Sequence, residues 1–300
     1  MKNVLVVYFT QSGQLAQIAQ NIAKPLVDDP GINVIFHEIK MVHPFPFPWD
    51  SESFFDVFPE SFQQIPAPIH PVPQEILNIK FDIVLLHYQV WYLSPSIPTT
   101  SFLKSADAAI LLDNTPVVTI NGSRNMWFQA QEKVKALLRA NGALLKGNIA
   151  MVDRAGNLIS VITIVKWMYS GKKEKYLGIF PKPGVSEAEI NSAGKFGFAI
   201  AKALHAASYD GLQDELLRLD AVRIRPFLLT VDKTGSKIFT KWSVIILKKS
   251  GIRKKLLKVF VVYLALAIWL ISPIVFILYL IKYPFIQGKI KKQVAYYKGV

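Results

Sequence analysis

The chain has 300 residues, enough for one large domain or for a domain with an appendage. It contains no cysteine, which excludes disulfides, thiolate catalysis and cysteine-bound zinc or iron–sulfur clusters. The net charge of +14 arises entirely from residues 233–300, which hold 14 Lys and Arg and no acid, so the neutral first 232 residues are not expected to bind nucleic acid.

The chain begins with a pattern that suits a phosphate site. Residues 3–9 are a short apolar run, typical of a strand buried on both faces of a parallel sheet. The polar turn Thr10–Gln14 follows, and residues 15–24 have apolar side chains at helical spacing. Such a turn aims free backbone N–H groups and the positive end of a helix at one point. The alternative is that Ser12 is merely a helix cap. With no cleavable leader before this strand, we expect the N-terminal part to stay in the cytoplasm.

A second strand is predicted over residues 32–39, and an unusual insertion follows at residues 41–75. The insertion holds eight prolines and seven Phe or Trp residues. Prolines at this density do not continue a helix or a central strand, and so many aromatic rings are not normally left in water. We expect a lid over a hydrophobic substrate or a membrane-facing surface. The alternative is a flap that only shields its own core.

A third strand is predicted over residues 81–88, and a helix over residues 98–107. In a doubly wound sheet, ligands bind beyond the carboxyl ends of the strands, where the strand order reverses. Trp91 and Tyr92 fall at that edge, where flat rings can stack on a planar cofactor. The alternative is that both rings are ordinary core or rim aromatics.

The fourth predicted strand, residues 116–120, ends in the turn Asn121-Gly122-Ser123-Arg124 at the same edge. The polar turn can bond the edge of a cofactor. Arg124 can face negative charge that develops on a reduced cofactor, or a cofactor phosphate. Its alternative role is a surface salt bridge.

The rest of the body continues the alternation of helices and strands. Helices are predicted over residues 129–140 and 186–206, and a fifth strand over residues 148–153. The apolar run 159–167 can line the site or touch lipid. Five strands alternating with helices predict a parallel α/β sheet.

Residues 1–207 resemble the flavodoxin-like superfamily through the turn after the first strand, Val90-Trp91-Tyr92 and Asn121-Gly122-Ser123-Arg124. The resemblance implies a doubly wound five-stranded parallel sheet that binds FMN. One departure is Leu15, where flavodoxins usually have another hydroxyl. By position we expect Tyr92 and Arg124 to act in catalysis. The implied FMN-binding residues are Thr10, Ser12, Gly13, Gln14, Trp91, Tyr92, Asn121, Gly122 and Ser123.

The nearer resemblance is to NAD(P)H-dependent, FMN-binding oxidoreductases, which implies hydride transfer to and from the flavin and NAD(P)H as donor. The opening and the apolar C-terminal extension also resemble the flavodoxin-like proteins called dialkylresorcinol condensing enzymes of bacterial aryl-lipid pathways. The superfamily does not determine the substrate.

The C-terminal part divides into a basic connector, residues 208–250, and a predicted membrane anchor, residues 251–300. In the connector, residues 223–247 are compatible with a hairpin that turns at Asp232–Gly235. The anchor contains residues 259–281, an uncharged run of 23 residues that is long enough to cross a bilayer as a helix. The alternatives are a buried helix and, because Pro273 implies a kink, a bent helix that enters and leaves one leaflet.

Basic clusters flank this run on both sides and are expected to bind anionic lipid head groups. We therefore expect an FMN-binding oxidoreductase, anchored to the cytoplasmic face of a membrane by residues 259–281, that acts on a hydrophobic, quinone- or lipid-like substrate. The alternatives are a non-redox condensing or cyclising enzyme of aryl-lipid synthesis and a non-catalytic membrane scaffold, which Leu15 favours. The five histidines have no metal-ligand spacing, so no metal site is predicted, and the sequence does not specify an oligomeric state.

Overall fold

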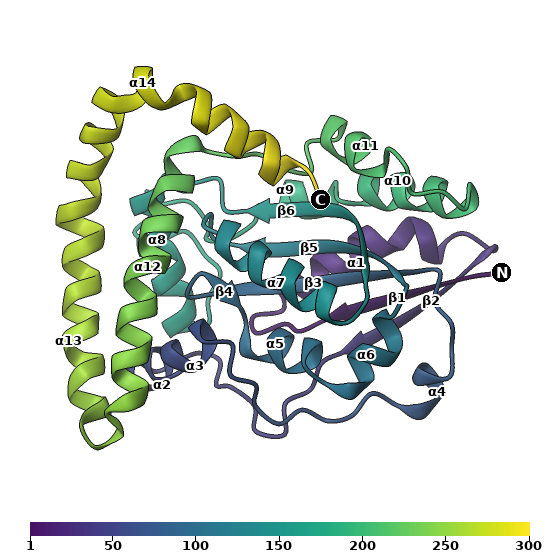
Figure 1. Cartoon of the computed structure of the whole chain (residues 1–300), viewed down its shortest axis with the longest axis horizontal. Helices are drawn as coiled ribbons and strands as arrows, with labels where there is room; N and C mark the ends of the chain where they lie inside the picture. Colours follow the sequence, from purple (N-terminus) through teal and green to yellow (C-terminus); the bar gives the residue numbers. More distant parts are fainter.

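The computed structural model describes all residues, 1–300, and its centre is a parallel sheet with helices on both faces (Figure 1). The strand order is β2-β1-β3-β5-β6, the order of flavodoxin-like doubly wound sheets, so the predicted fold class is confirmed. A two-residue strand, β4 (Ser94–Pro95), pairs antiparallel with β3. The five parallel strands are β1 (Lys2–Tyr8), β2 (Ile32–Glu38), β3 (Ile83–Trp91), β5 (Pro116–Ser123) and β6 (Leu144–Val152).

Strand β1 shows why the sheet is covered on both faces. Its residues Val4 and Val6 belong to one apolar cluster, Leu5 and Val7 belong to another, and all four are fully buried. Because successive side chains of a strand point to opposite faces, a continuous apolar strand needs helices on both sides. The first face is covered by α1 (Gln14–Val27), α9 (Glu187–Asn191), α10 (Gly194–His205) and α11 (Leu212–Arg218), and the second by α4 (Gln74–Leu77), α5 (Ile97–Leu103), α6 (Ala106–Leu112) and α7 (Phe128–Ala140).

Two predicted helices are each divided into two. The helix expected over residues 98–107 ends at Leu103, and a new one starts at Ala106, where the Ser105 hydroxyl accepts the N–H of Ala108 at 3.1 Å. The helix expected over residues 186–206 is also divided, into α9 and α10, but no side chain caps the start of α10. A serine that caps a helix offers the backbone an alternative to continuing the preceding one.

The insertion at residues 41–75 contains short helices that its prolines did not lead us to expect. They are α2 (Ser51–Asp56) and α3 (Phe58–Phe62). The Asp50 carboxylate accepts the N–H of Ser53 at 2.9 Å and so caps α2. Pro59 lies in the first turn of α3, where a helix needs no N–H from it.

The hairpin predicted over residues 223–247 is wrong, because this segment is one helix, α12 (Pro226–Lys248). Its buried residues Leu228, Asp232, Ser243 and Ile246 recur at helical spacing along one face. Gly235 does not turn the chain; it allows α12 to pack closely on Leu93, whose Cδ1 would lie 3.1 Å from an added Cβ.

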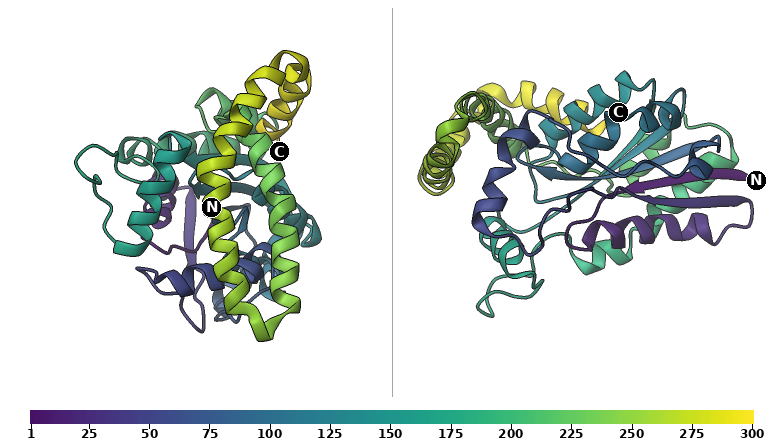
Figure 2. Two further views of the ribbon diagram at one scale, coloured as in Figure 1. Left: turned by 90° about the vertical axis from the view of Figure 1, so that its left-hand side faces the viewer. Right: turned by 90° about the horizontal axis from the view of Figure 1, so that it is seen from below.

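After a short 3-10 turn (Ser250–Ile252), one long helix runs to the end of the chain (Figures 1 and 2). It consists of α13 (Arg253–Leu266), a π-helical turn (Ala267–Ile271) and α14 (Ser272–Lys298). A kink was predicted at Pro273, and the structure has this π-helical turn directly before it. In Figure 1 the helix rises beside α12, bends and returns across the body to the C-terminus, and α14 contains a second proline, Pro284.

Both ends of the long helix contact the globular body. At its start, Arg253 forms ion pairs with Asp56 and Glu60, each with an N–O distance of 2.7 Å. At its end, the Tyr296 hydroxyl donates to Glu132 of α7 at 3.0 Å. The segment Ser250–Lys298, which includes both contacts, is by length and composition long and apolar enough to cross a membrane. Its outward side exposes Val262, Leu266, Leu270, Ile274, Ile277 and Phe285, among other apolar side chains.

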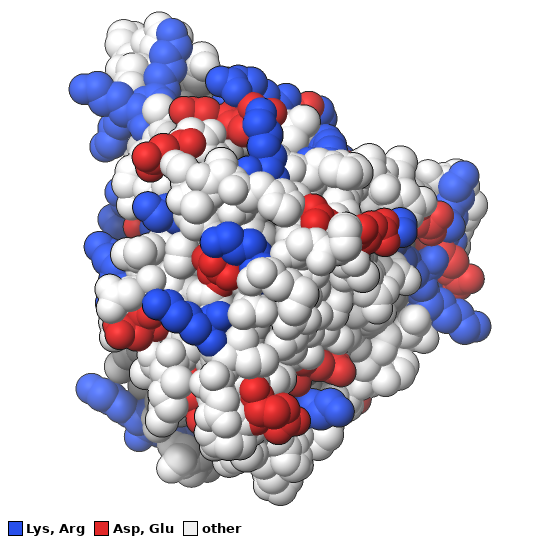
Figure 3. Space-filling model, turned by 90° about the vertical axis from the view of Figure 1, so that its right-hand side faces the viewer, with Lys and Arg blue, Asp and Glu red and all other residues white.

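The surface of the body differs from that of the tail. On the side of the body that carries the N-terminus, Lys and Arg are interspersed with Asp and Glu (Figure 3). No acidic residue follows Asp232, so the cations that flank the long helix can be compensated only by the body or by an external anion.

Candidate functional site

The loop between β1 and α1 leaves backbone donors free at the start of a helix of 14 residues. Gly13 precedes the helix with φ +83°, a left-handed conformation, and at this N-cap position it offers no side chain to the helix N–H groups. The N–H groups of residues 11–15 have no acceptor within the protein, while that of Ala16 donates to the Thr10 hydroxyl at 3.4 Å. Free N–H groups at a helix N-terminus can bind an anion.

Two glutamine side chains fasten this loop to its surroundings. Gln11 donates to the carbonyl oxygens of Phe45 and Pro46 at 3.2 and 2.6 Å, which ties the loop to the Pro-rich insertion. Gln14 donates to the carbonyl of Val185 at 3.1 Å and accepts the N–H of the same residue at 3.0 Å. Gln14 therefore positions the start of α1, and its side-chain amide already forms hydrogen bonds with the backbone of Val185.

Leu15 belongs to the apolar core and also lines the cavity described below. Its side chain is 2% exposed, and its Cδ1 would lie only 2.8 Å from a Cβ added to Gly122. Gly122, near the end of β5, thus makes room for Leu15. The residue that departs from the flavodoxin pattern serves packing between α1 and β5.

A cavity of about 420 Å³ opens beside this loop at the carboxyl ends of β1, β3 and β5. This is the edge where the strand order reverses between β1 and β3. Of its 27 lining residues 19 are hydrophobic, so the cavity suits a flat, largely apolar molecule. The expected site residues that line it are Ser12, Gln14, Trp91, Tyr92, Gly122, Ser123 and Arg124; Thr10, Gly13 and Asn121 do not.

Trp91 is held at the cavity wall by other aromatic rings. Its ring makes edge-to-face contacts with Phe9, Phe45 and Trp49 at centroid distances of 6.1, 5.2 and 5.6 Å. Two of these partners come from the insertion at residues 41–75, which also contributes Phe54 and other residues to the lining. The insertion therefore covers the cavity.

Tyr92 lies in a turn in which it and Leu93 both have positive φ, 50° and 60°. Two consecutive non-glycine residues in this conformation are costly, and such strain tends to occur at functional sites. The Tyr92 hydroxyl donates to the carbonyl of Phe54, and burial raises the pKa of Tyr92 well above its usual value. Its ring borders the cavity, while its proton is engaged in this hydrogen bond.

Asn121 and Ser123 face each other at the end of β5. The Ser123 hydroxyl donates to Asn121 Oδ1 at 2.9 Å, and Asn121 Nδ2 is buried without a hydrogen-bond partner. Next to them, Arg124 is held by Asn157, whose backbone oxygen and Oδ1 accept from one guanidinium nitrogen at 3.0 and 3.1 Å. Burial lowers the pKa of Arg124 to about 10, so the side chain stays protonated at neutral pH.

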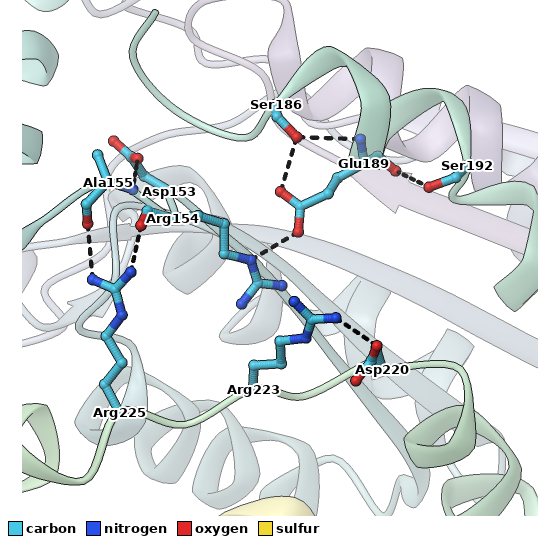
Figure 4. Close-up of polar contacts among 9 residues, drawn as sticks. All are labelled: Asp153, Arg154, Ala155, Ser186, Glu189, Ser192, Asp220, Arg223 and Arg225. Atoms are coloured by element: carbon cyan, nitrogen blue, oxygen red, sulfur yellow. Dashed lines mark hydrogen bonds and ion pairs between the residues drawn. The ribbon is translucent and has the colours of Figure 1, made fainter. Parts of the chain in front are cut away.

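The connection from β6 to α8 (Asn157–Ser170) is built around Asp153 (Figure 4). This buried carboxylate accepts from Ala155 N at 2.8 Å, Ser160 Oγ at 2.7 Å and Gly184 N at 3.3 Å. Arg225, directly before α12, donates to the carbonyl oxygens of Arg154 and Ala155. One turn thus fixes both α8, which lines the cavity, and the start of α12.

Helix α8 and the long C-terminal helix complete the walls. The apolar run at residues 159–167 was a candidate for lining the site, and Val161, Ile164 and Trp167 do line it. Five residues of the long helix that the sequence pattern placed in a membrane segment also line the cavity: Val261, Leu264, Ala265, Ile268 and Trp269. Helical spacing alone cannot say which face of an apolar helix contacts protein and which contacts lipid.

No protein-family model matches the chain, and no curated protein matches it. Among solved structures, it is similar to a flavoprotein from Lactobacillus acidophilus NCFM determined in complex with FMN, with 18% identity over 50% of this chain and 93% of that chain and a TM-score of 0.41. A WrbA-like flavodoxin from Agrobacterium tumefaciens matches with 14% identity over 69% and 100% of the two chains and a TM-score of 0.38. A flavodoxin from the domain Archaea has 11% identity over 68% and 99%, with a TM-score of 0.40. The assignment of the fold rests on the strand order of this chain itself.

Proposed function

We propose that the chain is an FMN-binding oxidoreductase that acts on a hydrophobic acceptor at a membrane surface. The observation that carries the proposal is the uncapped start of α1, where five free N–H groups lie next to the 420 Å³ cavity. In the proposed complex the FMN phosphate binds these N–H groups and the Ser12 hydroxyl. The ring system lies in the cavity between the start of α1 and the end of β5.

The remaining expected site residues take their roles from this placement. Trp91 and Tyr92 border the ring, and Gly122 and Ser123 lie along its edge. Arg124 supplies positive charge where a reduced ring would be negative. Bound FMN would supply hydride and electron transfer, and NAD(P)H is the proposed donor because of the resemblance to NAD(P)H-dependent enzymes.

The composition of the cavity walls supports the proposal that the substrate is hydrophobic. They come from the aromatic insertion, α8 and the long helix, and no acidic residue lines the cavity. A quinone- or lipid-like molecule could lose its hydration there at little cost in free energy. Desolvation of a strongly polar substrate in the same place would be unfavourable.

We further propose that the long helix attaches the protein to one leaflet at the cytoplasmic face. Both of its ends contact the same globular body, while the outward side between them is apolar. Lysines at both ends of this apolar stretch would contact anionic head groups. Residues 259–281 would then lie in the interface, as the bent-helix alternative requires.

The test is a flavin titration of the full chain in mild detergent. We expect a flavin absorption spectrum after reconstitution, and FMN binding at least about tenfold tighter than that of riboflavin, which lacks the phosphate but has the same ring. Equal affinity for both would contradict the phosphate site. A protein that binds neither would exclude the redox proposal, and its apolar cavity would then favour the non-redox condensing enzyme.

A further inference from the structure

A second cavity, of about 310 Å³, lies between α12 and the long C-terminal helix. The two helices run side by side in the left view of Figure 2. Fourteen of its 19 lining residues are hydrophobic, including Val231 and Ile238 of α12 and Val275 of α14. It adjoins the proposed flavin cavity, since both are lined by Val90, Tyr92, Arg124, Val161, Leu264 and Ile268.

Arg124 is the one charged residue among those that line either cavity. No carboxylate forms an ion pair with it, although the charge of Asp153 acts on it from beyond ion-pair distance; its contacts are the two oxygens of Asn157 and, at 3.6 Å, the sulfur of Met126. A guanidinium group has five N–H donors, so several of them remain available. A cation in apolar surroundings without a paired anion is unfavourable, and a bound anion at this point would compensate it.

We propose that the second cavity binds the hydrocarbon chain of a single-chain anionic amphiphile whose head group, a carboxylate or a phosphate monoester, binds Arg124. The apolar walls suit the chain, the single cation suits the head group, and the size of the cavity suits one chain. The long helix that forms one wall has an exposed apolar outer side, so a lipid surface is the natural source of the ligand.

This inference deepens the proposed function in one respect: the head group would lie at the junction with the flavin cavity, which makes the amphiphile the candidate substrate. Binding itself needs no flavin. The two proposals can therefore fail separately.

The experiment uses the flavin-free full chain in phosphatidylcholine nanodiscs with a dodecanoate probe that carries a diazirine near the end of its chain. Irradiation followed by peptide mapping should label residues within 231–239 and 263–275. Unlabelled dodecanoate or lysophosphatidate should compete, and the stronger competitor identifies the head group. Dodecanol, which has the same chain without charge, should compete at least about tenfold less well.

Two pairs of variants separate the head group from the chain. Arg124→Gln should reduce labelling about tenfold or more, and Arg124→Lys, which keeps the charge, should reduce it less. Ala267→Phe fills the second cavity only and should abolish labelling, whereas Ala265→Phe adds the same ring beside the first cavity only and should not.

Equal competition by dodecanol and dodecanoate would overturn the role of Arg124. Labelling that survives Ala267→Phe, or that maps to the exposed side of the long helix, would overturn the cavity assignment. FMN titration of Ala267→Phe in parallel reports on the flavin site independently.

Discussion

Asp232 Oδ2 accepts the backbone N–H of Phe128 at 2.9 Å, which joins the second turn of α12 to the first residue of α7. The carboxyl group is fully buried, and its other oxygen has no hydrogen-bond partner. Burial raises the pKa of Asp232 from 3.8 to about 7, while the helix N–H groups and the charge of Lys133 oppose the shift. The contact links the C-terminal helices to the sheet domain.

The raised pKa makes the stability of this junction depend on pH. The folded protein keeps the Asp232 proton at pH values where the unfolded chain has lost it. The contribution of this group to the free energy of unfolding is therefore greatest below about pH 4 and falls as the pH rises to about 7, by about 1.4 kcal/mol per unit and about 4 kcal/mol in all. Asp232→Asn keeps an acceptor for Phe128 but cannot ionise. We expect the variant to lose this slope and to be more stable than the wild type above pH 7.

Urea denaturation at pH 5 and pH 8 measures the effect as a difference between the two proteins. Taking that difference removes the contributions of all other titrating groups that the substitution leaves unchanged. A wild type and an Asp232→Asn variant with parallel pH profiles would show that the carboxyl group ionises normally in the folded protein.

Gly13→Ala tests the geometry of the proposed phosphate loop. Nothing lies within 4 Å of an added Cβ, so the only cost is the strain of an alanine at φ +83°, about 1–2 kcal/mol. Relief of that strain would reorient the free N–H groups, and we expect FMN affinity to fall about tenfold.

Gly178→Ala is the matched control, because Gly178 also has positive φ, 71°, and an equally open environment but lies outside the loop between β1 and α1. It should lose similar stability by chemical denaturation and bind FMN normally. If both variants lower FMN affinity to the same extent, the loss comes from general destabilisation and not from the loop.

Leu15→Ser restores the hydroxyl that flavodoxins usually have at this position. Because Leu15 is buried against Gly122, we expect a loss of about 3 kcal/mol in the free energy of unfolding and no gain in FMN affinity. The two quantities are measured by denaturation and by flavin titration of the same preparation. Tighter FMN binding by the variant would show that residue 15 faces the phosphate after all.

The sheet could be predicted from the sequence because each strand is an apolar run, and a run such as Val4–Val7 is buried whatever surrounds it. The composition of the insertion and of residues 159–167 predicted that both segments cover or line the site. The helix α12 could not be predicted, since Asp232–Gly235 has the composition of a turn, and its true role depends on contacts with Phe128 and Leu93, more than 100 residues away. The position of Arg124 between two cavities could not be predicted either, because it also depends on segments that are far apart in the sequence.

The arrangement of the long helix can be tested because the chain has no cysteine of its own. In Glu132→Cys combined with Tyr296→Cys, the two thiols replace side chains whose oxygens lie 3.0 Å apart. A short bis-maleimide added to membranes should link them within one chain, which is detected as a peptide pair after proteolysis. Glu132→Cys combined with Leu278→Cys, on the exposed side of the helix, should remain unlinked. If the helix crossed the bilayer, Tyr296 and Glu132 would lie on opposite sides, and the first pair would not be linked either.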